Sequence, residues 1–263
     1  MKNFKSIATA ALLAVSLSAS AQFTNSGSST KSTSVANTNG WSTIWVQWNP
    51  SKIKIDRKEA DDKSFTGLSF GYSQAFNITP SLPLFVEAGL GIQYSFHTEK
   101  LAEELADEYN MDEEDLEEIM DPKEKFNLFS VKIPVNLTYK FDIPNSSFSI
   151  APYFGLTMRF NLSGKAKMEY NLTSDAEDHL RSNGWSKKDI EETFGDKDRN
   201  LFDKKDMGSD KNTWKRFQLG WQLGVNARIK DTFLVGVSYG TDFSEIAEKS
   251  KVRTTSITLG YTF

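Results

Sequence analysis

The sequence predicts an all-β fold: an eight-stranded antiparallel up-and-down transmembrane β-barrel with two helical extracellular inserts. Three observations predict it: an N-terminal segment typical of export, eight segments in which apolar residues alternate with small or polar ones, and connections that are alternately long and short. Alternation with period two indicates a β-strand whose two faces meet different surroundings. We expect a signal peptide at 1–21, a flexible segment at 22–40, and a barrel domain at 41–263 with inserts 97–125 and 164–213.

The first residues have the pattern of a secretory signal. Lys2 and Lys5 precede an apolar run from Ile7 to Leu17, and Ala19 and Ala21 are small residues at the two positions that a signal peptidase reads. The run is too short to cross a membrane as a helix, which needs about 20 apolar residues. The sequence therefore predicts cleavage after Ala21. The next segment, 22–40, is rich in Ser, Thr, Asn and Gly and is expected to be flexible.

Composition excludes several classes of protein. The chain has no cysteine, so neither disulfides nor a lipid anchor on cysteine are expected. The formal net charge is −4, and cleavage would also remove Lys2 and Lys5, which argues against binding to nucleic acid. No other stretch approaches 18 consecutive apolar residues, which excludes a membrane protein built of helices. No cofactor is expected.

Eight segments show the strand pattern. In the last one, Ile257, Leu259 and Tyr261 alternate with small or polar residues, and the segment ends on an aromatic residue inside the pattern. In the second, Gln74 interrupts the apolar face, and the sequence offers no account of it. Pro50 is expected to end the first strand, because proline lacks the backbone N–H that a sheet needs. The expected strands are approximately 42–49, 65–78, 82–96, 126–141, 147–163, 214–229, 232–243 and 252–263.

The connections predict how the barrel is oriented. The short ones lie near 79–81, 142–146 and 230–231, and the longer ones are 51–63, 97–125, 164–213 and 245–251. Outer-membrane barrels have short periplasmic turns and longer outside loops. If the first strand runs outward, every long connection falls outside and the last strand ends at the periplasmic rim. That strand is expected to pair with the first near Ile44–Trp48, which would remove both sheet edges.

The faces of the strands predict which side meets lipid. A soluble barrel, the alternative, would turn its large apolar residues inward. Here the opposite face is rich in glycine and serine, which favours a narrow interior that admits a few long charged side chains, and a charge on the lipid side would cost about 2–4 kcal/mol near mid-bilayer. We therefore place the polar face inside. Its isolated charged residues are Glu87, Lys132, Lys140, Arg159, Arg228 and Asp242.

Buried charges need partners, so these residues are expected to form an interior charge network of Glu87, Lys132, Arg159, Arg228 and Asp242. The two carboxylates would neutralise some of the three cations. An eight-stranded barrel is about wide enough to be filled by side chains, so no open pore is expected. A proton path or an ion gate built from the same residues is the functional alternative.

Four segments resemble a known family. They are Ser130–Phe141, Ser149–Leu156, Leu84–Tyr94 and the closing Thr258–Phe263. Together they resemble the outer-membrane protein β-barrel domain family of Gram-negative bacteria, which is related in architecture to the OmpA-like and opacity-like small barrels. The resemblance covers residues 41–263 apart from the two inserts. It implies location in the cell outer membrane and assembly through a C-terminal strand that ends in an aromatic residue, with Tyr261 and Phe263 as the assembly signal. Within these segments Pro134 and Pro152 lack a ladder donor and are expected to mark bulges or bends.

Catalytic and metal-binding residues are not expected. Small barrels that resemble lipid A acyltransferases or deacylases use histidine with serine at the outer rim, and this chain has only His97 and His179. Ser95 lies on the same strand face as His97, but no acid to orient the histidine is identified. The run Asp196–Asn200 copies the opening of a calcium-binding EF-hand loop, yet the sixth position is leucine and the twelfth is methionine, so the motif fails. The acidic run at 112–118 is interpreted as a solvated helix face that attracts divalent cations only loosely.

The inserts share an internal similarity. Ala102–Met120 aligns with Ala176–Phe194 without gaps, and five positions match. Met111-Asp112 and Trp185-Ser186 each place an apolar residue before a residue suited to cap a helix. Each insert is therefore expected to be a small helix–turn–helix over the barrel mouth. The alternative is two acidic loops that match by composition alone.

These observations predict a structural or surface-interaction role. The alternatives are a lipid-modifying outer-membrane enzyme and an accessory barrel in protein export or transport. The expected partners are outer-membrane lipid, the barrel-assembly machinery during insertion, and an extracellular ligand or protein that meets the helical inserts.

Overall fold

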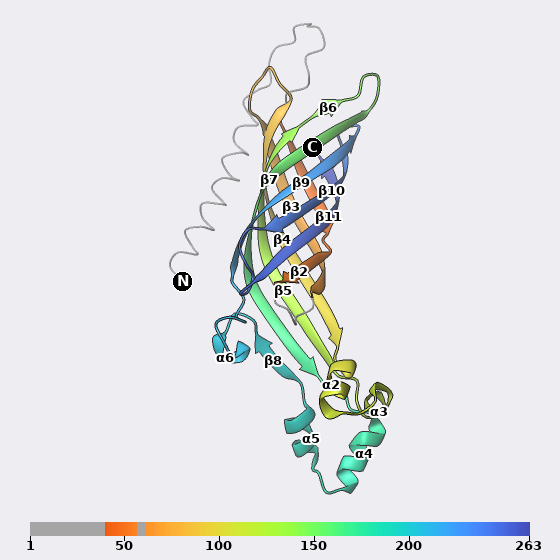
Figure 1. The fold of residues 1–263 in the computed structure, drawn as a ribbon. Helices are drawn as coiled ribbons and strands as arrows, with labels where there is room; N and C mark the ends of the chain where they lie inside the picture. The colour runs from red at the N-terminus through yellow and green to blue at the C-terminus, as the bar shows by residue number, and fades with distance from the viewer. Residues whose placement is uncertain (1–39, 57–61) are drawn as a thin grey trace.

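The computed structural model describes residues 40–56 and 62–263. The expected signal peptide, its cleavage residues Ala19 and Ala21, and the segment 22–39 lie outside the described residues. The rest is an antiparallel sheet closed into a ring of eight strands (Figure 1), because β1 pairs with both β3 and β11. This confirms the predicted barrel and the pairing of the last strand with Ile44–Trp48. The strands of the ring are β1 (Trp41–Trp48) continued by β2 (Ser51–Ile55), β3 (Lys63–Asn77), β4 (Leu84–Lys100), β5 (Lys123–Tyr139), β7 (Phe148–Glu169), β9 (Phe217–Ile229), β10 (Phe233–Asp242) and β11 (Ser250–Thr262).

The prediction that Pro50 ends the first strand is wrong. β2 pairs with the same neighbours as β1 and keeps the same register, so the strand continues through the proline. The carbonyl of Pro50 accepts a hydrogen bond from the backbone N–H of Thr255 at 3.0 Å, and the N–H of Asn49 donates to Gly67 at 2.7 Å. Proline itself supplies no donor to the ladder. The loop expected at 51–63 is therefore shorter and begins after Ile55.

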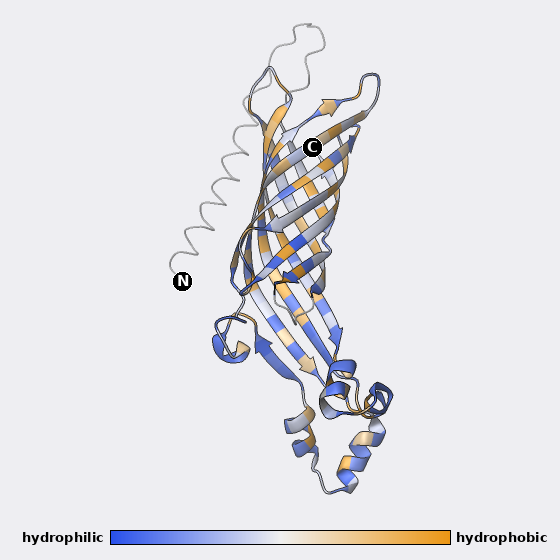
Figure 2. Ribbon diagram, in the orientation of Figure 1, coloured by the Kyte–Doolittle hydropathy of each residue, from blue (hydrophilic) through white to orange (hydrophobic). Residues whose placement is uncertain are grey.

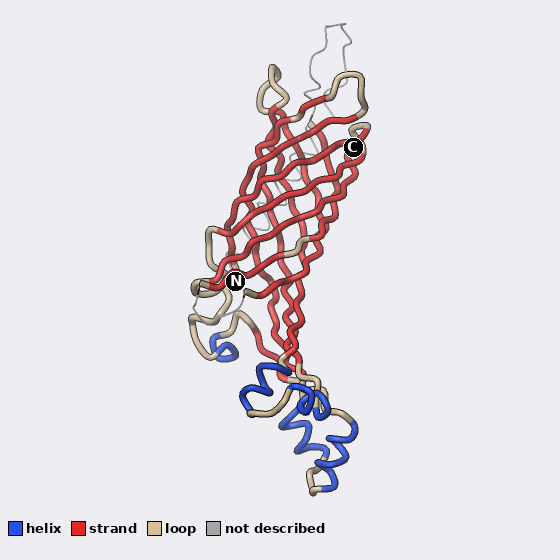
Figure 3. The backbone as a smooth tube through the Cα atoms, turned by 45° about the vertical axis from the view of Figure 1, so that its right-hand side comes forward, coloured by secondary structure: helices blue, strands red, loops and turns tan. Residues whose placement is uncertain are grey.

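The three longest strands far exceed the length that a membrane requires. A tilted transmembrane strand needs about 9–11 residues, whereas β4 and β5 have 17 each and β7 has 22. They run past the expected ends at 96, 126 and 163, and the short strand β8 (Lys197–Asn200) pairs with the end of β7. Figures 1 and 3 show that they project beyond the ring. We call this three-stranded extension the projection, and the end of the barrel that carries it the long-loop end.

One β-bulge changes the faces of β7 at the base of the projection. Phe129 is opposite Ser163 and Ser130 is opposite Asn161, which leaves Leu162 as the extra residue. The expected bulges at Pro134 and Pro152 are absent: β7 keeps its register through Pro152. The β4–β5 ladder instead has a gap at Ile133 and Pro134, between the pairs Ala88–Val135 and Gly91–Lys132.

The apolar face of the strands points outward. Leu68, Phe154 and Leu259 are each more than half exposed, while the serines, glutamines and charged residues of the alternate positions are buried. Figure 2 shows the resulting mixture of hydrophobic and hydrophilic positions along each strand. This confirms the predicted direction of the two faces. Gln74, which interrupts the apolar face, is hydrogen-bonded: its side-chain oxygen accepts hydrogen bonds from the hydroxyls of Ser42 and Tyr72, at 2.5 and 2.7 Å.

Four helices lie at the tip of the projection (Figure 1), so they do not rest directly on the mouth as expected. The two predicted cap residues, Asp112 and Ser186, are the N-caps of the second helix of each insert. A fifth, one-turn helix, α6, and the two-residue strand β6 were not anticipated. None of the helices in residues 40–56 and 62–263 has the length and apolar character to cross a membrane. The helices are α2 (Ala102–Tyr109), α3 (Glu113–Ile119), α4 (Ser174–Ser182), α5 (Lys187–Phe194) and α6 (Lys204–Met207), and β6 is Phe141–Asp142.

Candidate functional sites in the interior, at the mouth and at the tip

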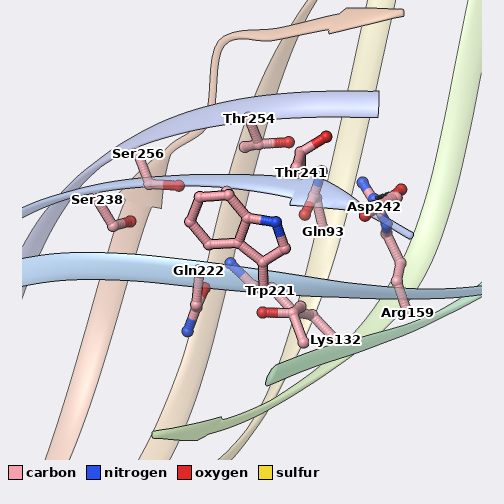
Figure 4. A pocket seen from close by; sticks show the side chains of 12 residues that line it. Gln93, Lys132, Arg159, Trp221, Gln222, Ser238, Thr241, Asp242, Thr254 and Ser256 are labelled. Carbon is pink, nitrogen blue, oxygen red and sulfur yellow. Dashed lines mark hydrogen bonds and ion pairs between the residues drawn. The ribbon is translucent and has the colours of Figure 1, made fainter. Parts of the chain in front are cut away.

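The five residues of the expected charge network are all buried inside the ring, on β4, β5, β7, β9 and β10. The structure brings two of them together. Arg159 Nη2 lies 2.6 Å from Asp242 Oδ2, and both side chains are more than nine-tenths buried. Figure 4 shows this pair beside Lys132 and Gln93. The strands that carry Arg159 and Asp242 are not neighbours, since β9 lies between β7 and β10.

The other three charged residues have polar or aromatic partners instead. Lys132 Nζ donates to Gln47 at 3.2 Å. Glu87 accepts a hydrogen bond from Ser73 at 2.5 Å. The guanidinium of Arg228 lies 3.8 Å from the ring centre of Trp41, a cation–π contact. Among these five residues there is thus one direct ion pair, and the other three contact polar or aromatic side chains that the alternation pattern did not single out.

Lys140 completes the set at the short-turn rim. Its ammonium lies 3.0 Å from Asp142 and 2.8 Å from Asp231, and the lysine is almost fully buried although both carboxylates are about half exposed. Asp142 belongs to β6, in the connection between β5 and β7, and Asp231 to the turn after β9. This pairing ties that connection to the turn.

The glycines of the inner face make room for aromatic rings. Trp45 points inward and is only 6% exposed. A Cβ at Gly71 or Gly91 would come within 2.4 Å of its indole, and a Cβ at Gly224 would lie 2.6 Å from the Tyr153 ring. The expectation that the glycines admit long charged side chains is therefore incomplete. Two interior cavities of about 30 and 40 Å³ remain, each on the scale of a water molecule.

At the long-loop end the inner face becomes apolar and closes the mouth. Phe65, Phe126 and Val252 are buried on the strands, and Leu201 and Ile246 pack on them from the loops. Leu201 is held by backbone hydrogen bonds to Gly164 and Trp214, at 3.0 and 2.8 Å.

The histidine and serine considered for an enzyme lie beside this cluster. The His97 ring is 5.2 Å from Phe65, and its Nε2 is buried with no hydrogen-bond partner and 3.8 Å from Glu99. Ser95 is buried and accepts a hydrogen bond from Gln93 at 2.9 Å. The geometry does not place the Ser95 hydroxyl on His97 Nε2, the contact that a serine–histidine mechanism uses. His179 lies in α4, far along the chain from both, and contacts Asn183.

The two inserts are joined into one unit, which we call the helical tip (residues 101–122 with α2 and α3, and residues 170–195 with α4 and α5). Met120 and Leu172 form a β-bridge, and the N–H of Thr173 donates to the carbonyl of Ile119 at 2.9 Å. The Thr173 hydroxyl donates to the carbonyls of Glu118 and Ile119, at 2.9 and 3.2 Å, and accepts from the N–H of Ala176 at 3.3 Å. One side chain therefore closes the end of α3 and caps the start of α4.

The projection is stabilised by ion pairs on its outer side. Glu169 lies 2.6 Å from Lys125 and 3.0 Å from Lys167, and Lys167 also lies 2.5 Å from Asp196. Hydrogen bonds from Lys125 and Lys167 lower the pKa of Glu169 to about 2. In the folded protein this carboxylate therefore stays ionised at pH values below the ordinary pKa of a glutamate. Its contribution to stability is lost only as the pH falls from that ordinary pKa toward 2.

The run Asp196–Asn200, which resembles an EF-hand opening, forms β8 and its approach. Asp196 is bound by Lys167, and Asn200 pairs with Lys165 on β7. In the part of the chain that the structure describes, no three acidic or histidine side chains are grouped as ligands for a metal ion.

The residues of the expected assembly signal lie on the seam between the first and last strands. Tyr261 is opposite Ile44, and Phe263 exchanges two backbone hydrogen bonds with Ser42, at 2.9 and 3.0 Å. Both aromatic side chains are more than half exposed on the outer surface. The ring of Tyr261 also contacts Phe233, 5.9 Å away on β10.

The chain is similar to known outer-membrane barrels. The family model "Outer membrane protein beta-barrel domain" matches residues 7–263. No curated protein matches the chain. Among solved structures, Ail of Yersinia pestis in complex with the heparin analogue sucrose octasulfate is 15% identical, with 85% of this chain and 99% of that chain covered and a TM-score of 0.38. Neisserial surface protein A is 13% identical, with 84% and 95% covered and a TM-score of 0.38. The outer membrane enzyme PagL is 9% identical, with 83% and 97% covered and a TM-score of 0.37.

Proposed function

The chain belongs to the outer membrane protein beta-barrel domain family and lies in the outer membrane, and from this premise we propose that it has a structural, surface-interaction role. The closed ring anchors the projection in lipid, and the helical tip is the recognition surface outside the cell. One observation carries the proposal: the two inserts, which come from different loops, are joined through Thr173 and the Met120–Leu172 bridge into one unit.

The joint matters because recognition favours ordered surfaces. A loop that must be ordered on binding costs free energy that a preorganised surface does not. α5 begins at a well-formed cap, in which Ser186 and Asp189 form a reciprocal capping box. The tip thus presents its side chains on helices with defined ends.

Charge defines the class of partner. Between residues 101 and 122 the sequence has eleven acidic residues and no lysine or arginine. Tyr109 is 68% exposed at the end of α2, and Trp185 is exposed before α5. Exposed aromatic side chains within a strongly acidic surface suit a partner with a basic, partly apolar surface. We propose a basic extracellular protein or peptide as the partner.

Photo-crosslinking on intact cells tests this role. A photoreactive amino acid at Tyr109 should capture a basic partner, and the same substitution at Lys251, which is exposed on β11 outside the tip, should not. Raising the salt concentration should weaken capture because the attraction is between exposed charges. The proposal fails if Tyr109 and Lys251 give the same products or if neither gives any.

A trimmed variant supplies the control. Lys100 and Lys123 are opposite each other in the β4–β5 ladder, so an Asn-Gly turn can replace 101–122 and close the hairpin in register. This variant should reach the outer membrane at the normal level, and a photoreactive amino acid at Trp185, which the variant keeps, should capture the partner only in the untrimmed protein.

We also expect the ring to conduct no solutes. Trp45, Tyr153 and the Arg159–Asp242 pair occupy the interior, and its cavities are of the size of single waters. In planar bilayers the protein should show no stable conductance steps. Trp45→Ala, which removes the largest inward ring beside Gly71 and Gly91, is the variant most able to open a passage. A stable pore in the nanosiemens range from the unaltered protein would contradict a filled interior.

A further inference from the structure

A separate cavity lies at the mouth of the barrel, and none of its lining residues belongs to the helical tip. It has a volume of about 370 Å³, roughly ten times that of either interior cavity. Its walls come from β2, β5, β7 and β8, and from the loop segments around α6 and Ile246. Ligand-binding pockets begin at about 300 Å³.

The walls of this mouth cavity are mainly apolar and include an aromatic stack. Ile53, Met207 and Ile246 line it together with Phe126 and Trp214. The rings of Phe126 and Trp214 are nearly parallel, with an interplanar angle of 5° and centroids 6.4 Å apart. At about 30 Å³ for each molecule of liquid water, the space equals roughly a dozen waters. A single apolar body of about that many non-hydrogen atoms would fill it.

The charged residues of the lining are three cations and one carboxylate. Lys63, Arg199 and Lys211 line the cavity with Glu124. Arg199 pairs with Glu124, and Lys63 lies 3.7 Å from the same carboxylate. The further acids that Lys63 and Lys211 contact, Glu99 at 2.5 Å and Glu248 at 3.8 Å, are not among the lining residues. Lys63 and Arg199 are thus closely paired with carboxylates, whereas Lys211 is largely exposed and 3.8 Å from its acid, so Lys211 is the cation of the lining best placed to bind a ligand.

We propose that the mouth cavity binds a small amphipathic anion: an apolar chain or ring system of about a dozen non-hydrogen atoms with a single carboxylate. The apolar body packs against the Phe126–Trp214 stack, and the carboxylate binds the largely exposed Lys211. Such a ligand matches both features of the site, because the apolar walls bind the body and Lys211 offsets the cost of placing a carboxylate near them.

Calorimetric titration of the full-length protein in phosphatidylcholine nanodiscs tests the proposal, with the heat of empty nanodiscs subtracted. The probes are decanoate for a chain and 2-naphthoate for a ring system, each beside its uncharged analogue, decanol or 2-naphthalenemethanol. At least one carboxylate should bind saturably at one site per barrel, at least about tenfold more tightly than its analogue, as expected for a charge-assisted hydrogen bond. The carboxylate that binds more tightly shows whether the apolar part of the ligand is a chain or a ring system.

Variants tie the binding to this cavity. Ala166→Phe fills it from β7 and should abolish binding, and Ala247→Trp fills it from the loop if the first variant loses its heat-modifiable mobility. Lys211→Ala should weaken carboxylate binding several-fold. Lys204→Ala is the matched control, because Lys204 is equally exposed but pairs with Asp210 and does not line the cavity. Non-saturable heat, equal binding of the uncharged analogues, or unchanged binding in a folded cavity-filled variant would overturn the proposal.

Discussion

At the scale of single residues, the alternation of the strands predicted which side chains face inward but not which of them meet. Period two fixes the face of each residue, so Glu87, Lys132 and Arg228 could be placed inside from the sequence. Pairing depends on the stagger between strands and on side-chain reach. Arg159 contacts Asp242 across an intervening strand, and no spacing in the sequence encodes that contact.

The same limit applies to the inner glycines. The sequence shows that each glycine is small, but the aromatic side chain for which it makes room lies on another strand. Trp45 on β1 is packed against Gly71 on β3 and Gly91 on β4. The sequence did contain one signal for this packing: Trp45 occupies an inward position, and the inward positions of the neighbouring strands are rich in glycine.

The buried ion pair gives a prediction at this scale. Asp242→Asn keeps the shape of the side chain but leaves Arg159 with an uncompensated charge in the interior. Removing one partner of a buried pair costs about 3–5 kcal/mol, and we expect a loss of that size in urea unfolding from phosphatidylcholine vesicles. Asp142→Asn is the matched control: Asp142 is half exposed and its lysine keeps Asp231, so the loss should be about 1 kcal/mol or less. Equal losses in the two variants would show that the interior is hydrated enough to screen the charge.

At the scale of elements, the predictions succeeded where a local signal was strong. The capping residues Asp112 and Ser186 marked the starts of α3 and α5, and the aligned inserts hold helices in corresponding positions. The predictions failed where a strand continues without the regular alternation of apolar and polar residues. Beyond the bulge at Leu162 the faces of β7 exchange, which hid its last residues, and β8 forms only because β7 is there to pair with.

The joint between the inserts gives the prediction for this scale. Thr173→Val keeps the β-branched shape but removes the hydroxyl that caps α4 and binds the end of α3. Loss of an N-cap costs about 1 kcal/mol, so the amides of both helices should exchange with deuterium about fivefold faster. Thr193→Val is the control, because its hydroxyl donates only to Asp189 within α5. If exchange rises in α4 alone, the two inserts are independent and the tip is not one unit.

At the scale of the whole molecule, the fold could be predicted because its evidence is spread over the entire chain. Strand count, loop alternation and face polarity all agree, and a single error, such as ending the first strand at Pro50, leaves the topology unchanged. The sites could not be predicted to the same degree. The mouth cavity and the tip each combine residues from several loops, and loop conformation depends on contacts that no periodicity records.

Closure of the ring gives the last prediction, and it concerns the seam where Phe263 meets Ser42. Deleting Phe263 removes two backbone hydrogen bonds from the seam, worth about 1–3 kcal/mol together, whereas Phe263→Ala keeps those bonds and removes only the ring. Refolding into lipid vesicles should therefore be impaired by the deletion and nearly normal for Phe263→Ala. We expect both variants to reach the outer membrane of cells at lower levels, because the exposed ring is what the barrel-assembly machinery would recognise. If Phe263→Ala assembles at the normal level in cells while the deletion does not, Phe263 acts through its backbone alone and the ring is no signal.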